Sequence, residues 1–325
     1  MSKLLSKLNA IDENKNQSFS DDFKAHHEII RKTGWLALIG NPKTKKAYLF
    51  DVIDFIFSSE INSIKELCNV STHHLEKWKK ILNEKNISPS TIRRKLSSIS
   101  SLMDHLQSND FIDHNPVKKV MRPCRKSIES KTPSLDSKQV KKLLKAPDVN
   151  TIKGKRDRAI LSVFLYHALK CNELCSLKTE DLYHEEKCYY FKINGNTRKT
   201  RNIAVHPKTI FLINDYLQNS DHRNDTKGFL FRPLKNSFSK STNKALSQYA
   251  IYNNIVKYYS KKAGIEIKGL CTHSLRVTSA SNALKYHKDM TLVQTWLGHS
   301  SITTTRLYNK TKERSFSSPT YSIKY

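Results

Sequence analysis

Residues 297–308 of the chain read LGHSSITTTRLY, and this run decides how the rest of the sequence is interpreted. A glycine stops the preceding helix, His299 follows it directly, and a new segment ends on Tyr308. Upstream, His273 and Arg276 stand three residues apart, so on a helix they share one face. Each feature alone has an ordinary reading as a capping, ion-paired or surface residue. The ordered set of two histidines, an arginine and a tyrosine is far more specific than its parts.

These four side chains suit an attack on a phosphodiester. Such a reaction needs a nucleophile, cationic donors for the non-bridging oxygens and an acid for the leaving oxygen. Tyr308 supplies a nucleophile, but an ordinary phenol has a pKa of about 10 and needs a proton acceptor and a cationic environment to attack. The planar fork of Arg276 grips two phosphate oxygens, while His273 and His299 hydrogen-bond oxygens or move a proton.

The charge of the chain indicates the same kind of substrate. Its 57 Lys and Arg residues outnumber its 29 Asp and Glu residues and leave a net charge of +28, so we expect a polyanion as partner. The hydrophobic fraction of 38% suffices to bury cores and excludes a disordered basic tail. No run approaches the roughly 18 apolar residues of a membrane span, and the N-terminus lacks the apolar core of a signal peptide. We therefore expect a cytoplasmic protein, nucleoid-associated if bacterial, without membrane contact.

The length of 325 residues exceeds one ordinary domain and predicts two domains with a linker. Apolar residues recur mostly at helical spacing, whereas Asn194-Gly195 between two runs of strand formers predicts a hairpin, so we expect a mainly α fold with a small antiparallel β-sheet, of the α+β class. The predicted helices lie around residues 48–56, 74–82, 89–106, 136–144, 156–166, 209–217, 247–263, 275–286 and 290–296. The expected parts are a polar N-terminal extension (1–43), a helical domain (44–116), a basic linker (117–134), a second domain containing the sheet (135–310) and a C-terminal tail (311–325).

Two groups of cations are candidates for phosphate contact. Arg93, Arg94 and Lys95 form the polar side of a predicted helix, and Arg125 and Lys126 belong to the basic linker. Because the whole chain carries a large positive charge, we predict that both groups contact phosphates of the expected polyanion. A merely solvated helix face is the alternative for the first group.

A metal site has one candidate. His167, Cys171 and Cys175 recur every four residues and would share a helix face. Small cysteines on an apolar helix face are common, and no fourth ligand is evident, so we predict no metal site. None of the six cysteines forms a C-x-x-C pair, and we expect reduced thiols.

The run at 297–308 resembles the C-terminal signature of the tyrosine recombinases, the integrase family that includes phage integrases and bacterial chromosome-dimer resolvases. Residues 156–160 and 173–182 look like the family's first catalytic block, and residues 88–116 are similar to its helical core-binding domain. The resemblance therefore covers residues 44–310 or so. It implies that the first helical domain is the core-binding domain and the second the catalytic domain.

The resemblance also implies the family's chemistry, which is site-specific cleavage and rejoining of double-stranded DNA in integration, excision, resolution or inversion. Tyr308 would form a covalent 3′-phosphotyrosyl intermediate and release a free 5′-hydroxyl, with Arg276, His273 and His299 as catalytic partners and without a nucleotide cofactor or required metal. Four protomers, monomeric or dimeric when free, would act on two paired sites through a Holliday junction. Accessory directionality proteins would be further partners.

Two positions depart from the family's pattern. Where the family has a Gly-Leu-Arg turn, this chain has Ala168-Leu169-Lys170, so Lys170 keeps the charge but loses the bidentate fork. A lost transition-state donor typically costs about 2.7–4 kcal/mol, which the retained charge softens. The family's general-acid lysine follows a hairpin glycine, and that place falls on Asn196; in another register Lys199, or less readily Arg198, takes the role. We include Lys170 and Lys199 in the predicted catalytic set.

These departures leave other classes of function open. One is a non-catalytic or weakly catalytic DNA-binding relative with an architectural or regulatory role, which the intact set of tyrosine, arginine and histidines opposes. A type IB topoisomerase shares the nucleophile chemistry but relaxes DNA without paired sites. A generic basic nucleic-acid-binding protein would explain only the charge.

Overall fold

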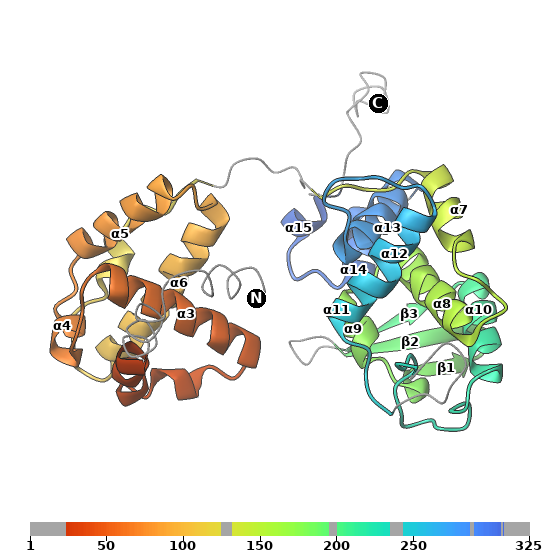
Figure 1. Ribbon diagram of the computed structural model, residues 1–325, viewed down its shortest axis with the longest axis horizontal. Coiled ribbons are helices and arrows are strands. Elements are labelled where there is room, and N and C mark those ends of the chain that lie inside the picture. The colour runs from red at the N-terminus through yellow and green to blue at the C-terminus, as the bar shows by residue number, and fades with distance from the viewer. Residues whose placement is uncertain are drawn as a thin grey trace, which may run out of the picture. The chain divides into compact units, whose positions relative to one another are not determined.

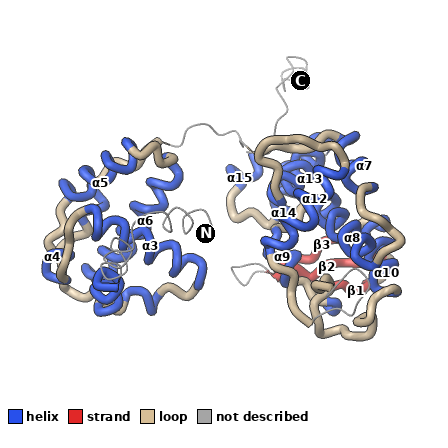
Figure 2. The backbone as a smooth tube through the Cα atoms, viewed as in Figure 1, coloured by secondary structure: helices blue, strands red, loops and turns tan. Residues whose placement is uncertain are grey.

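The computed structural model describes residues 24–124, 132–194, 200–234, 243–286, 289–306 and 308. The chain divides into two compact units, Met1–Ser127 and Ile128–Tyr325, each with its own hydrophobic core (Figure 1). Helices make up most of both units, and the three strands of the described residues lie together in the second unit (Figure 2). The prediction of a mainly α fold with a small antiparallel sheet is confirmed.

Local capping signals start the helices of the first unit. The Asn41 side chain accepts hydrogen bonds from the amides of Lys43 and Thr44 at the start of α3, which has Pro42 at its first position. Ser88 and Pro89 play the same roles for α6. A helix over residues 24–32 opens the described part. The other elements of the unit are η1 (Trp35–Leu38), α3 (Pro42–Ser58), α4 (Ile64–Cys68), α5 (Thr72–Glu84), α6 (Pro89–Ser108) and η2 (Pro116–Lys119).

The core of the first unit lies where α3, α5 and α6 meet. Phe55 packs edge-on against Trp78, with ring centroids 5.1 Å apart, and both side chains are fully buried together with Leu96 and Met103. Burying each such side chain stabilises a fold by about 1.5–3 kcal/mol. The three helices predicted for this part of the chain are confirmed.

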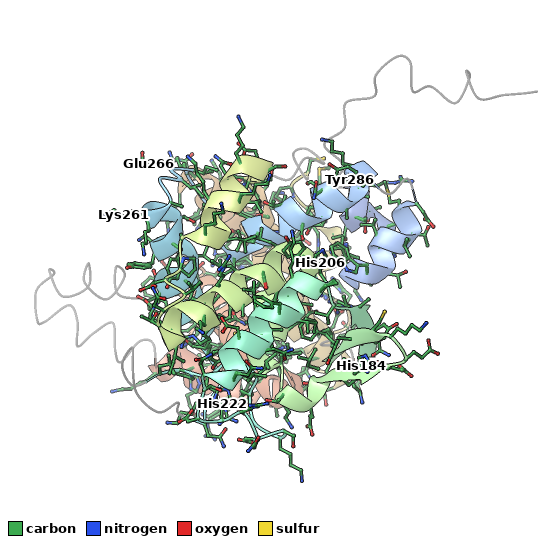
Figure 3. All side chains as sticks on the ribbon, turned by 90° about the vertical axis from the view of Figure 1, so that its right-hand side faces the viewer. His184, His206, His222, Lys261, Glu266 and Tyr286 are labelled. Atoms are coloured by element: carbon green, nitrogen blue, oxygen red, sulfur yellow. The ribbon has the colours of Figure 1, made fainter. Side chains whose placement is uncertain are left out.

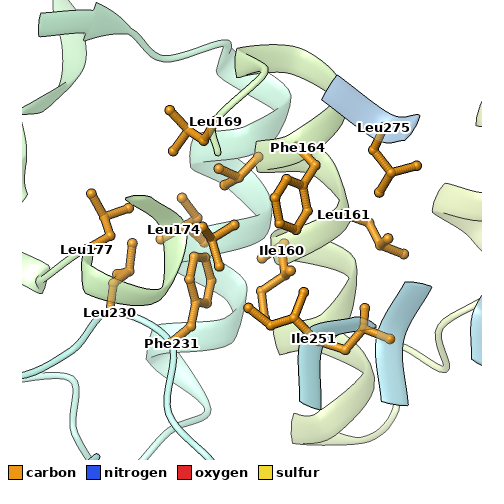
Figure 4. Close-up of a cluster of buried hydrophobic side chains, with 14 of the residues drawn as sticks. Ile160, Leu161, Phe164, Leu169, Leu174, Leu177, Leu230, Phe231, Ile251 and Leu275 are labelled. Atoms are coloured by element: carbon orange, nitrogen blue, oxygen red, sulfur yellow. The ribbon is translucent and has the colours of Figure 1, made fainter. Parts of the chain in front are cut away.

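The second unit is built around α8 (Ile152–His167). Its residues from Ala159 to Phe164 are all buried, so this part of the helix is covered by the rest of the unit on every side. Figure 4 shows Ile160, Leu161 and Phe164 among buried side chains from several neighbouring segments. The helices of the unit are α7 (Ser137–Lys145), α8, α9 (Cys171–Ser176), η3 (Thr179–Asp181), α10 (Pro207–Gln218), α11 (Gln248–Ala250), the π-helical η4 (Ile251–Lys257), α12 (Tyr258–Lys262), α13 (Thr272–Tyr286), α14 (Met290–Leu297) and α15 (Ile302–Arg306).

The sheet has the antiparallel order β1-β2-β3, from β1 (Leu182–Glu185), β2 (Cys188–Asn194) and β3 (Thr200–Ala204). Phe191 pairs with Ile203, and both are buried on the face that adjoins the core. The last described pair of the β2–β3 hairpin is Asn194 with Thr200. The predicted turn between them lies outside the described residues.

Figure 3 shows the face of the second unit on which α8 and α10 lie, with His206 labelled at the start of α10 and His184 on β1. His206 stacks on Tyr166 of α8, with ring centroids 4.4 Å apart. Within the ranges that the structure covers, no helix is both long enough and apolar enough to cross a bilayer.

Candidate active site

Five of the predicted catalytic residues line one pocket of about 380 Å³ in the second unit: Lys170, His273, Arg276, His299 and Tyr308. They come from the start of α9, the first turns of α13, the turn after α14 and the segment after α15. Segments far apart along the chain therefore meet at one place. The spacing of these residues in the sequence predicts that they share one site, and the packing of α13 against α14 brings them together.

Arg276 is the most firmly held side chain of the pocket. It is only 2% exposed. Its Nη1 donates to the carbonyl oxygen of Ala168, and its Nη2 donates to the carbonyl of Leu297 at 2.7 Å and to Nε2 of His299 at 2.9 Å. Burial lowers the pKa of Arg276, while the nearby Tyr308 opposes this, and the group remains a cation. A guanidinium carries five N–H groups, so these contacts leave others for a phosphate.

His299 is a neutral ring at physiological pH. Burial first, and then the charges of Arg276, Lys170 and Arg201, lower its pKa to about 4. Its Nδ1 lies 3.0 Å from the hydroxyl oxygen of Thr305. The ring therefore has both nitrogens engaged within the protein.

Tyr308 is 5% exposed and belongs to a small apolar cluster with Ala168, Val277 and Leu297. Its ring stacks on His299 with centroids 5.6 Å apart, and the ring of His273 lies 6.2 Å away. Its amide donates to the carbonyl of Thr305 at 3.0 Å, and its carbonyl accepts from Ser281 at 3.0 Å. The phenol also interacts with the Arg276 guanidinium.

His273 differs from His299 in its surroundings. It is exposed at the start of α13, and the structure records no hydrogen bond for its ring among the described residues. Although the residue as a whole is exposed, its ring is partly desolvated by the protein around it, and this first, and then the charge of Arg276, lowers its pKa, which favours the neutral ring. This histidine is free to contact a ligand in the pocket.

Lys170 is held loosely. Its Nζ lies 3.7 Å from Glu173, and its side chain is 42% exposed. Glu173 instead pairs with Arg201 of β3, whose two terminal nitrogens donate to its two oxygens at 3.0 and 2.9 Å. Burial would raise the pKa of Glu173, but the hydrogen bonds and charge of Arg201 outweigh it and the pKa is lowered. The ammonium of Lys170 is therefore left to face the pocket.

Sequence reasoning missed the roles of Glu173, Arg201 and Thr305. Glu173 and Thr305 lie inside the motifs at 173–182 and 297–308, whereas Arg201 is a half-buried cation of a short strand that no motif includes. Gly298 ends α14 with φ +63°, and a Cβ there would lie 2.8 Å from Nη1 of Arg201. The predicted helix stop thus also makes room for this arginine.

Five other residues named in the sequence analysis cannot be placed relative to this pocket. Lys199, Arg125 and Lys126 lie outside the described residues, as do Asn196 and Arg198. No catalytic or phosphate-binding role is tested for them by the structure.

The polar triplet of α6 has partners within the first unit. Arg93 donates to the carbonyl of Pro123 at 2.9 Å, and Arg94 pairs with Asp51 of α3. Lys95 pairs with Asp54 at 2.7 Å. Contact with DNA phosphates stays a prediction for these three, and it would have to compete with the acids of α3.

His167 has a structural position. It is 1% exposed, and its Nε2 accepts the amide hydrogen of His206 at 3.0 Å. Among the residues that the structure describes, no group of three or more His, Cys, Asp or Glu side chains is arranged to hold a metal ion. Burial lowers the pKa of His167 to about 4.

This shift predicts a loss of stability in acid. Between pH 6.5 and pH 4 the unfolded chain binds a proton at residue 167 that the folded protein does not, so stability falls as pH falls through that window. We expect this one histidine to reduce the free energy of unfolding by about 2 kcal/mol between pH 7 and pH 5. Urea titrations of wild type, His167→Gln and the exposed control His184→Gln measure it. The same pH dependence in all three proteins would contradict the prediction.

The sequence profile of the phage integrase family matches residues 133–314. A tyrosine recombinase of Pseudothermotoga lettingae is 30% identical over 273 residues, which is 82% of this chain and 86% of that protein. The structure is similar to that of the XerH site-specific recombinase bound to its difH substrate after cleavage, with a TM-score of 0.64, 21% identity, and 81% of this chain and 75% of that one covered. It is also similar to a lambda integrase tetramer bound to a Holliday junction, with a TM-score of 0.61, 16% identity, and 87% and 78% covered.

Proposed function

This chain belongs to the phage integrase family, the tyrosine recombinases, and from that membership we propose that it is a site-specific DNA recombinase that cleaves and rejoins DNA through a covalent 3′-phosphotyrosyl intermediate on Tyr308. One observation carries the proposal: Tyr308 shares a single pocket with Arg276, His273, His299 and Lys170. The reaction class needs a nucleophile and cationic donors at one phosphate, and the pocket supplies both.

In the proposed reaction the phenolic oxygen of Tyr308 bonds to phosphorus, and the bond from phosphorus to the 5′-oxygen breaks. Tyr308 loses a proton and the leaving 5′-oxygen gains one. Arg276 and Lys170 hold the non-bridging oxygens, where negative charge develops, and His273 donates a further hydrogen bond. The phosphotyrosyl bond conserves the energy of the cleaved linkage, so attack by a 5′-hydroxyl reverses the steps and rejoins a strand. Lys199 is our candidate for the acid that protonates the leaving oxygen.

The proposed assembly is a tetramer on two paired duplex sites, formed from free monomers or dimers and passing through a Holliday junction. The similar lambda integrase has been seen as a tetramer on such a junction, which supports this proposal. Accessory proteins would set the direction of exchange. We place the activity in the cytoplasm, where the DNA substrate lies.

The test is a suicide-substrate assay. A duplex site is first selected from random DNA by binding. A nick is then placed close to the cleavage position, so that cleavage releases a short fragment that carries the free 5′-hydroxyl. This fragment diffuses away and cannot rejoin the strand. The wild-type protein is expected to remain attached to the 3′ end as a covalent adduct that survives denaturation. A protein that binds the site tightly and forms no adduct under any condition would contradict the proposal.

Lys170→Arg is expected to speed this cleavage. An arginine restores the bidentate grip on a phosphate, which an ammonium lacks. We expect a rise in the initial rate of adduct formation of roughly 10-fold, part of the roughly 100- to 1,000-fold that one lost transition-state donor costs. Lys178→Arg is the matched control, because Lys178 is exposed, pairs with Glu180 and does not line the pocket. An unchanged or slower rate in Lys170→Arg would show that the lysine already serves the site fully.

A second candidate function follows from the two departures from the family's pattern, Lys170 and Asn196. The chain would be a DNA-binding relative with an architectural or regulatory role, in which the loosely held ammonium no longer supports cleavage. In that case the wild type gives no adduct on a site that it binds, and Lys170→Arg gains one. Relaxation of arbitrary supercoiled DNA by monomers would instead indicate a topoisomerase.

A further inference from the structure

Thr305 contacts both His299 and Tyr308, the two site residues of the segment 297–308. It is fully buried in α15, which stands directly before Tyr308. Its hydroxyl oxygen lies 3.0 Å from Nδ1 of His299, and its carbonyl accepts the amide hydrogen of Tyr308 at 3.0 Å. One side chain that does not line the pocket thus contacts a residue that does.

The hydrogen bonds around His299 determine which of its nitrogens carries the proton. A guanidinium only donates, so the contact from Nη2 of Arg276 requires an unprotonated Nε2 that accepts. A neutral imidazole has one N–H, which must then be on Nδ1. The Nδ1–H donates to the hydroxyl oxygen of Thr305.

The charges that face His299 favour the same state. Arg276, Lys170 and Arg201 are cations, and His273 and Tyr308 are its other ionisable neighbours. Among the described residues, burial and the charges of Arg276, Lys170 and Arg201 act most strongly on the ring, and all of them oppose a second proton. The neutral ring needs an acceptor for its one N–H, and Thr305 provides it.

We propose that Thr305 is a positioning residue of the recombinase proposed above, and that it holds His299 in the Nδ1–H tautomer so that Nε2 accepts from Arg276 and fixes the guanidinium before DNA binds. The inference rests on the proposed function for its effect on cleavage. The assignment of the His299 tautomer is independent of the proposed function, because the tautomer is a property of the DNA-free protein.

The opposite tautomer would disturb Arg276. With the proton on Nε2, two N–H groups would face each other across the present 2.9 Å contact. Arg276 would keep its bonds to the carbonyls of Ala168 and Leu297 but would lose the acceptor that Nε2 of His299 provides. The guanidinium would then be less well placed for a phosphate.

The test compares Thr305→Val, which removes the acceptor, with Thr305→Ser, which keeps the hydroxyl. Thr295→Val is the matched control, because the Thr295 hydroxyl donates to the carbonyl of Thr291 in its own helix. Nitrogen-15-labelled histidine in DNA-free protein near pH 7 reports the tautomer from the shifts of the two ring nitrogens, and the His299 signals are assigned by their loss in His299→Gln. The suicide-substrate assay gives the rate of adduct formation for each variant.

We expect the Nδ1–H tautomer of His299 in wild type, Thr305→Ser and Thr295→Val, and its partial or full replacement by Nε2–H in Thr305→Val. We expect adduct formation by Thr305→Val to slow roughly 10- to 100-fold, which is the change in rate that corresponds to the free energy of leaving one buried polar group unpaired. Thr305→Ser should form the adduct within about threefold of the wild-type rate. An Nε2–H signal in the wild type overturns the proposal, even if Thr305→Val does not fold. A folded Thr305→Val protein in which either the tautomer or the rate of adduct formation stays as in the wild type also overturns it. A wild type that shows the Nδ1–H tautomer but forms no adduct on DNA would sink the proposed function and leave the assignment of the proton standing.

Discussion

Tyr308→Phe is expected to abolish covalent attachment to DNA while leaving DNA binding and the fold intact. The substitution removes one hydroxyl and keeps the ring that packs on His299 and in the apolar cluster with Leu297. The main-chain bonds of residue 308 to Thr305 and Ser281 are also kept. Because no other group replaces a missing nucleophile, we expect adduct formation to fall on the order of 10⁴-fold or more.

The measurement is the denaturation-resistant adduct on the nicked site, with binding of the intact site measured in parallel. Tyr286→Phe is the matched control, since Tyr286 is 73% exposed at the end of α13 and lies outside the catalytic pocket. It should react at the wild-type rate. An adduct that persists in Tyr308→Phe would assign the nucleophile to another residue and remove the basis of the proposed mechanism.

Arg276→Lys is expected to give the second largest effect. An ammonium is a compact point charge and cannot reach the carbonyls of Ala168 and Leu297 while also gripping two phosphate oxygens. We expect adduct formation to slow roughly 100- to 1,000-fold, the loss typical of a removed transition-state donor, with affinity for the intact site little changed because the positive charge remains. The same substitution should lower the free energy of unfolding by about 1–3 kcal/mol, since it leaves buried acceptors unpaired.

The rate is measured on the nicked site and the stability by urea titration. Arg223→Lys serves as the control, because Arg223 is exposed in the same unit. If Arg276→Lys cleaved like the wild type, Arg276 would be only a structural cation. Weaker binding of the site with an unchanged rate at saturating protein would show that Arg276 binds the ground state and the transition state alike.

The sequence predicts much of this site because its signals are local or of fixed spacing. Pro89 after Ser88, and Gly298 before His299, each mark a helix end by the chemistry of one or two residues, and the structure has those ends. The fixed interval from His299 to Tyr308 predicts that both belong to one site, and they lie against each other.

Contacts between distant segments could not be predicted in this way. The pair of Glu173 with Arg201 depends on how β3 lies beside α9. The cations of α6 look available for DNA until α3 brings Asp51 and Asp54 beside them. The π-helical turn at Ile251–Lys257 bonds each amide to the carbonyl five residues back, but its buried residues Ile251, Ile255 and Val256 stand at a spacing that an α-helix also allows. The hairpin residue that acts as acid, for which Lys199 is our candidate, stays a prediction.

The way Arg276 is held bears on how the protein can change over generations. Two of its acceptors are the main-chain carbonyls of Ala168 and Leu297, and every amino acid carries a carbonyl. A point mutation at either position alters a side chain without deleting the acceptor, so the arginine is buffered against drift as long as the backbone keeps its path. Lys170 has no such protection, since its recorded anchor is a loose contact to one carboxylate. Variation within the pocket is therefore expected to accumulate at position 170 before it reaches position 276.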